Sequence, residues 1–152
     1  MREILFKAKR IDNGKWVEGY YCKWLKGERI ITYSEKETDC IITWMSNGGM
    51  SRYEVDPETI CQFTGLHDKH GNKIWENDIV EYHFDNTKKA PIRYGTYQSC
   101  FDTKETAHCG FYVDWSEKTY FRKDLGYWIN MIEANVVGNI FDNPELLKGG
   151  SE

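Results

Sequence analysis

Short apolar runs that alternate with polar residues dominate this sequence. Near the start, Ile4, Phe6 and Ala8 occupy every second position, which places them on one face of a β-strand. Asn13 and Gly14 follow, and an Asn-Gly pair between two alternating runs is the strongest short signal for a hairpin, because both positions tolerate a positive φ. Apolar residues do not recur with a 3.6-residue period over more than two helical turns. The chain is therefore predicted to be mainly β.

The pattern divides the chain into three predicted parts. Residues 1–55 are predicted to form an N-terminal β-meander subdomain that includes a strand at residues 29–33. Residues 56–143 are predicted to form a small SH3-like, partly open barrel, in which residues 125–132 could be strand or short helix. Residues 144–152 are predicted to be a short helical turn and a tail, because Asn, Pro and an acid in succession can begin a helix.

The stretch from residue 64 to residue 82 contains two predicted tight turns. In the first, Asp68 accepts backbone N–H groups and Gly71 supplies a positive φ. In the second, Asn77 occupies the position that needs a left-handed backbone. Each turn precedes an apolar strand, which is how a chain is steered around the corner of a small barrel. A structural role is therefore assigned to Gly65, Asp68, Gly71, Asn77 and Asp78.

Three blocks of sequence, in order, carry a family resemblance. They are residues 2–8 with 14–21, residues 55–80 with their Gly-Leu-x-Asp-x-x-Gly and Ile-Trp-Glu-Asn-Asp-Ile-Val motifs, and residues 137–147. Together they resemble the YopX family of bacteriophage and prophage proteins. The resemblance implies a small, mainly β, cytoplasmic phage protein with no established activity. The middle motif is similar to the turn-then-strand corner of SH3-like barrels, with Asn77 in place of the usual Gly.

An enzyme is one alternative. Glu76 and Asp78 could act as a general acid and base with His83 or Cys109, as in a small hydrolase. However, an Asp in a tight turn usually accepts backbone hydrogen bonds. His108 could not activate the adjacent Cys109, because neighbouring residues on a strand face opposite ways. No catalytic residue, metal site or cofactor is assigned, and a protein without enzymatic activity is the preferred interpretation.

Exposed aromatic and basic residues of the barrel support a binding hypothesis. Such residues can stack bases or grip a peptide. The candidate binding residues are Arg93, Tyr94, Tyr97, Trp115, Arg122 and Lys123. A net charge of −4 disfavours binding that depends on neutralising phosphates, so nucleic-acid binding is kept as an alternative. The preferred function is a binding or accessory module that acts through protein–protein contacts, with self-association and a host or phage protein as partners.

The expected location is the cytoplasm of a bacterial host. No apolar run approaches the ~18 residues that a membrane span needs, so no membrane association is expected. The N-terminus has no apolar segment or cleavage site typical of a secretory signal. The five cysteines lie far apart in the sequence, as expected for reduced thiols in a reducing compartment.

Overall fold

The computed structural model describes residues 3–26, 36–82, 85–115 and 122–148. The predicted strand at residues 29–33 and the predicted tail after residue 148 lie outside these ranges. The chain divides into two compact units, Met1–Phe63 and Thr64–Glu152. This division falls further along the chain than the predicted boundary after residue 55.

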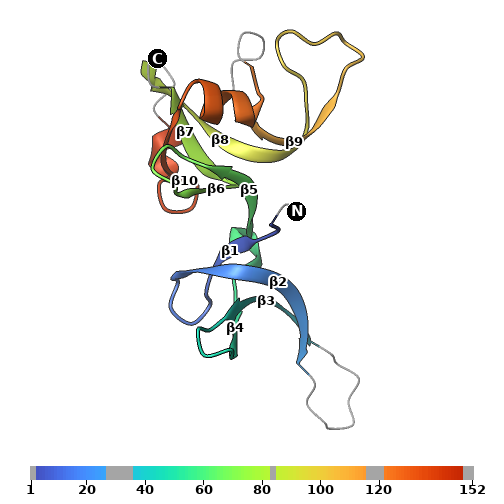
Figure 1. The fold of residues 1–152 in the computed structure, drawn as a ribbon, viewed down its shortest axis with the longest axis vertical. Helices are drawn as coiled ribbons and strands as arrows, with labels where there is room; N and C mark the ends of the chain where they lie inside the picture. Colours follow the sequence, from blue (N-terminus) through green and yellow to red (C-terminus); the bar gives the residue numbers. More distant parts are fainter. Residues whose placement is uncertain (1–2, 27–35, 83–84, 116–121, 149–152) are drawn as a thin grey trace. The chain divides into compact units, whose positions relative to one another are not determined.

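The first unit is built on antiparallel strands in the order β4-β3-β2-β1-β5 (Figure 1). Its elements are β1 (Phe6–Lys9), β2 (Trp16–Lys26), β3 (Lys36–Trp44), β4 (Met50–Glu54), the 3-10 turn η1 (Pro57–Thr59) and the start of β5 (Cys61–His67). In η1, Pro57 follows the capping residue Asp56, whose carboxylate accepts the Glu58 N–H.

The second unit contains a four-stranded antiparallel sheet in the order β10-β7-β8-β9. Its elements are β6 (Lys73–Trp75), which pairs with β5, then β7 (Asp78–Tyr82), β8 (Asp85–Tyr97), β9 (His108–Val113), a π-helical turn η2 (Tyr127–Met131), β10 (Asn135–Asn139) and the 3-10 turn η3 (Pro144–Leu147). Of the two conformations considered for residues 125–132, the helical one is present.

The β1–β2 hairpin forms at the predicted place, but its turn differs from the expected one. Among the described non-glycine residues only Asn77 and Glu133 have a positive φ, so Asn13 does not share the left-handed conformation of Gly14, whose φ is 68°. The Asn13 side chain instead accepts the Lys15 N–H at 2.9 Å. The turn is therefore held by an Asn side chain and a single left-handed glycine.

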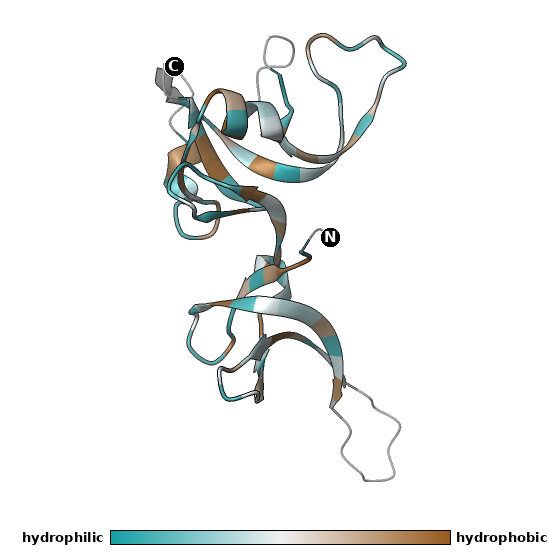
Figure 2. Ribbon diagram, viewed as in Figure 1, coloured by the Kyte–Doolittle hydropathy of each residue, from teal (hydrophilic) through white to brown (hydrophobic). Residues whose placement is uncertain are grey.

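Each unit has its own apolar core. In the first unit Ala8, Ile41 and Val55 are buried, and partly buried hydrophobic residues pack around them. The core of the second unit is larger and is built from both sheet and helix residues: Ile74, Val80, Ala90, Ile92, Val113, Trp115, Leu125, Trp128, Ile129 and Ala134. Figure 2 shows hydrophobic residues interleaved with polar ones along the strands, as expected for sheets with one covered face.

The prediction of a mainly β protein is confirmed. Neither antiparallel sheet is closed into a barrel, so the SH3-like arrangement stays a prediction. No helix in the described ranges has the length and apolar character needed to cross a bilayer.

Candidate functional site

The turn at Asp68 is stabilised by one carboxylate. Its Oδ1 accepts the backbone N–H groups of His70 and Asn72, both at 2.8 Å. The Asn72 side chain donates to Oδ2, and these hydrogen bonds lower the pKa of Asp68. Gly71, with φ of 84°, closes the turn. The contacts of Asp68 are therefore those of a turn residue.

The second turn joins three strands through Asn77, whose φ is 67°. Its N–H donates to the Ile92 carbonyl at 2.8 Å, and its carbonyl accepts the Ile140 N–H at 3.0 Å. Its side-chain oxygen accepts a hydrogen bond from Arg93 at 2.5 Å. Asn77 is thus a buried junction between the start of β7, β8 and the end of β10.

The Asp78 carboxylate also accepts a backbone hydrogen bond. It is buried, and its Oδ2 accepts the Trp75 N–H at 2.8 Å. Cys109 cannot share a site with it, because Asp78 is level with residue 92 of β8 whereas Cys109 pairs with Thr96. Four residues along a strand correspond to about 13 Å. His83 lies outside the described residues, and no three His, Cys, Asp or Glu residues among those described could hold a metal ion.

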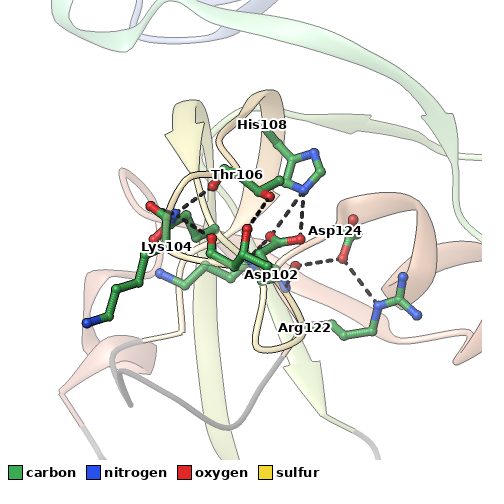
Figure 3. A network of polar contacts seen from close by, with 10 residues as sticks. Asp102, Lys104, Thr106, His108, Arg122 and Asp124 are labelled. Carbon is green, nitrogen blue, oxygen red and sulfur yellow. Dashed lines mark hydrogen bonds and ion pairs between the residues drawn. The ribbon is translucent and has the colours of Figure 1, made fainter.

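A polar network closes the loop between β8 and β9 (Figure 3). The His108 Nε2 lies 3.1 Å from Asp102 Oδ2, and the same carboxylate accepts the Ser99 N–H. The Ser99 hydroxyl donates to Asp124 Oδ2 at 2.8 Å, and Arg122 donates to that oxygen at 3.2 Å. The network therefore connects the loop to the segment that precedes η2.

This network includes a Ser, a His and two carboxylates, but not the arrangement of a nucleophile with its base. The Ser99 hydroxyl donates to Asp124 and accepts the Lys123 N–H at 3.1 Å, whereas His108 contacts Asp102. A hydrogen bond from the Ser99 N–H, followed by one from His108, lowers the pKa of Asp102. Burial raises the pKa of Asp124, but hydrogen bonds from Ser99 and Arg122 outweigh burial and lower it. Both carboxylates thus serve as anionic acceptors that hold the loop.

Three rings stand side by side on the β8–β9 hairpin. Tyr97 stacks on His108 at 5.3 Å and on Tyr112 at 5.1 Å. The two tyrosines meet across Gly95 and Gly110, which are directly opposite each other and present no side chain. Burial is the main cause that raises the pKa of both Tyr97 and Tyr112. The Tyr97 ring is therefore stacked on neighbouring rings of the hairpin and is only partly exposed.

The other predicted binding residues have different environments. Trp115 is 5% exposed and packs on Trp128 at 4.9 Å, so it is a core residue and not an exposed aromatic. Lys123 lies over Tyr112 and near Asp114, and Arg122 pairs with Asp124 and lies over Tyr127 at 4.5 Å. Only Tyr94 is strongly exposed, at 54%. The structure therefore brings Arg93, Tyr97 and Lys123 together around Tyr112. Trp115 is buried and Tyr94 lies on the opposite side of β8, so the six residues do not form one open surface.

A contiguous exposed surface lies instead on the first unit. Tyr20, Ile42 and Arg52 are direct neighbours across β2, β3 and β4, and the Trp44–Met50 pair lies two residues further along the same face. The exposed fractions are 67% for Trp44, 53% for Met50 and 46% for Tyr20. With Trp24, on which Arg52 stacks, these residues form what we call the aromatic face: Tyr20, Trp24, Ile42, Trp44, Met50 and Arg52.

Sequence reasoning did not identify the aromatic face. Four residues alternate along β2 and share one face: Trp16, Tyr20, Cys22 and Trp24. Val17 and Tyr21, on the opposite side, pack on the core. A strand with aromatic residues on both sides gives no direct signal of which side is covered. The available signal was Arg52 in β4, because a charged residue in a short strand marks its face as open to solvent.

Fold and surface together define a mainly β protein of two compact units, with one exposed aromatic sheet face. The chain belongs to the YopX family, since the family model described as "YopX protein" matches residues 6–148. It is also similar to a solved structure described as protein EF1440 from Enterococcus faecalis, with 21% identity, a TM-score of 0.49, and coverage of 97% of this chain and 99% of that one. No curated protein matches the chain.

Proposed function

We propose that this protein is a non-enzymatic binding or accessory module, encoded by a phage or prophage, that acts through protein–protein contacts in the bacterial cytoplasm. The aromatic face is the observation that supports this proposal. Trp, Tyr, Met and Arg are the residue types enriched in the cores of protein interfaces, and five of the six residues of the aromatic face are of these types. A monomeric protein rarely leaves a large contiguous apolar patch in contact with water.

Nucleic-acid binding through the second unit has less support. Arg93 donates to Asn77, Arg122 pairs with Asp124, and Lys123 lies near Asp114. These three basic side chains therefore already make contacts within the protein, and their charge is partly neutralised where the partner is a carboxylate. The net charge of −4 opposes the same function.

Site-specific photo-crosslinking in host bacteria tests the proposal. A photoreactive phenylalanine analogue is placed at Trp44, and a matched control carries it at Phe101, which is 82% exposed in the second unit. We expect a discrete protein adduct from residue 44 and none from residue 101. We also expect the same protein to be lost from affinity purification when Trp44 and Tyr20 are both replaced by Ser.

Three results would count against the proposal. They are identical adducts from the two positions, no protein adduct from residue 44, or recovery of nucleic acid in place of protein. An adduct between two copies of the chain would assign the aromatic face to self-association, and sedimentation of the Trp44→Ser variant as a smaller species would support that assignment.

A further inference from the structure

One edge of β4 is open. The Val55 N–H donates to the Asp39 carbonyl, and the Met45 N–H donates to the Gly49 carbonyl, at either end of the β3–β4 ladder. Alternate residues of an antiparallel strand direct their peptide groups to the same neighbour. Residues 51, 53 and 55 therefore bond to β3, and the peptide groups of Met50 and Arg52 point away from it. Among the described strands β4 is the last in its sheet, so this edge can accept another strand.

A shallow hollow begins where this edge ends. The Ile11 N–H donates to the Glu54 carbonyl at 3.0 Å, and Arg10 forms an isolated bridge with Val55. The segment after β1 therefore covers the end of β4 and leaves its start open. The hollow has a volume of about 360 Å³ and is lined by Arg10, Ile11, Asp12, Arg52, Tyr53 and Glu54. It can receive a few side chains of an extended segment.

Arg52 is the residue at this edge that would favour a ligand with a carboxylate. Its guanidinium lies over the Trp24 ring, 4.2 Å from the centroid, which orients the planar group. It forms no ion pair with a carboxylate of the described residues. Arg10, which also lines the hollow, already pairs with Asp12. On the aromatic face beside this edge, Arg52 therefore presents a guanidinium that has no carboxylate partner among the described residues, and such a group can bind a carboxylate through two parallel N–H groups.

We propose that β4 binds an extended acidic peptide of a partner protein as an added strand. An apolar side chain of the peptide packs on Trp44 and Met50, and a carboxylate two positions away binds Arg52, as the period of a strand requires. This proposal rests on the proposed function and names its partner class.

A second copy of the chain fits this edge less well. An antiparallel pairing of two β4 strands centred on Arg52 places the two guanidinium groups opposite each other, and like charges in that position repel. Centring the pair on Tyr53 would place Arg52 opposite Glu54, but the Glu54 carbonyl already accepts the Ile11 N–H. Centring it on Ser51 would place Arg52 opposite Met50, which supplies no carboxylate. None of these pairings gives Arg52 an acid, so the proposed partner is one that supplies it.

Two synthetic peptides test the proposal with the full chain labelled with ¹⁵N. Each has seven residues of high β-propensity with a Leu two positions from an Asp, and the second has Lys in place of that Asp. We expect the Asp peptide to shift the amide signals of β4. We expect the Arg52→Glu variant to bind the Asp peptide about tenfold or more weakly than the wild type does, and to bind the Lys peptide instead. Lys23→Glu, a charge reversal at an exposed residue of β2, is the control and should leave affinity unchanged.

A backbone variant separates strand addition from simple charge attraction. Arg52→Pro removes an N–H that points away from β3, whereas Arg52→Ala keeps it. We expect Arg52→Pro to bind more weakly than Arg52→Ala, with amide spectra that establish that both variants are folded. If Arg52→Pro does not fold, the test rests on the Arg52→Glu variant, which should prefer the Lys peptide to the Asp peptide.

Several results would overturn the inference. They are peptide binding that ignores the charge at residue 52, amide shifts that fall away from β4, or no binding of either peptide at millimolar concentration. If residue 44 crosslinks to a protein while the peptides do not bind, this inference fails and the proposed function stands. If neither experiment detects binding, both fail.

Discussion

Substitution of Asn77 separates its backbone role from its side-chain role. Asn77→Ala keeps a Cβ at a residue with φ of 67° and removes the acceptor of the Arg93 hydrogen bond. Asn77→Gly removes the same acceptor but relieves the left-handed conformation. A comparison of the two variants therefore isolates the cost of the conformation, and both should preserve the main-chain bonds to Ile92 and Ile140.

The magnitudes follow from these contacts. A hydrogen bond from a charged donor contributes about 1.5 kcal/mol when the donor, like Arg93, is only partly buried, and both variants lose it. A left-handed backbone costs a residue with a Cβ about 1 kcal/mol more than Gly. Because Asn77 already has a Cβ, Asn77→Ala keeps the backbone cost and Asn77→Gly removes it. We therefore expect the free energy of unfolding to fall by about 1.5 kcal/mol for Asn77→Ala and by about 0.5 kcal/mol for Asn77→Gly.

Urea unfolding of the full chain, followed through amide signals of β7, β8 and β10, measures these changes. The comparison requires that the free energy of unfolding decreases with urea concentration at the same slope in each variant. A double-mutant cycle with Arg93→Met should return a coupling of about 1.5 kcal/mol between the two side chains. The reasoning is refuted if Asn77→Ala is as stable as Asn77→Gly, because the left-handed backbone would then carry no cost.

Three further predictions concern other parts of the structure. A hydrogen bond from Tyr21 to Asp39, at 2.6 Å, raises the pKa of Tyr21 to about 12, above its usual value of about 10. The stability that this raised pKa adds is full below pH 10 and is lost as the pH rises toward 12, and Tyr21→Phe should remove this loss in alkaline unfolding curves. Gly138→Ala should lower the free energy of unfolding by about 1–3 kcal/mol, because a Cβ there overlaps the Asn143 side chain. Trp115→Ala should lower it by about 3–5 kcal/mol, because it leaves a cavity in the core of the second unit. Urea unfolding monitored by circular dichroism measures both losses.

Each of these predictions has an outcome that contradicts it. An alkaline transition that is the same in Tyr21→Phe would show that the hydrogen bond is not the cause. Wild-type stability of Gly138→Ala would mean that Asn143 moves aside without loss. A Trp115→Ala variant as stable as the wild type would place Trp115 outside the core.

Local turn chemistry was the part of the fold that the sequence predicted best. The left-handed backbone at Asn77 follows from local sterics, because few residues other than Gly tolerate it. The Asp68 turn is also local, since its acceptors and donors lie within four residues. The hairpin at Gly14 was correctly placed, but its turn type was not, because the Asn13 side chain competes for the Lys15 N–H.

The surfaces were predicted less well, because burial depends on residues far away in the chain. Trp115 is indistinguishable from an exposed aromatic by its neighbours, and the helical segment that contains Trp128 covers it. The aromatic residues of β2 gave no prediction of which side is exposed, and in the structure Tyr20 and Trp24 face solvent. A sequence read alone does not show which side of a two-sided strand another segment will cover.

The glycine pair under the tyrosines predicts how this hairpin can vary in evolution. Gly95 and Gly110 lie opposite each other in mid-strand; the Tyr112 ring lies beside the space above Gly95, whereas a Cβ at Gly110 would have no heavy atom within 4 Å. A Cβ at Gly95 would lie 3.9 Å from the Tyr112 ring, so a larger side chain would displace that ring. Relatives with a bulky residue at the position of Gly95 should therefore have a smaller residue in place of Tyr112. These two positions should change together, whereas the position of Gly110 should vary independently of the tyrosines.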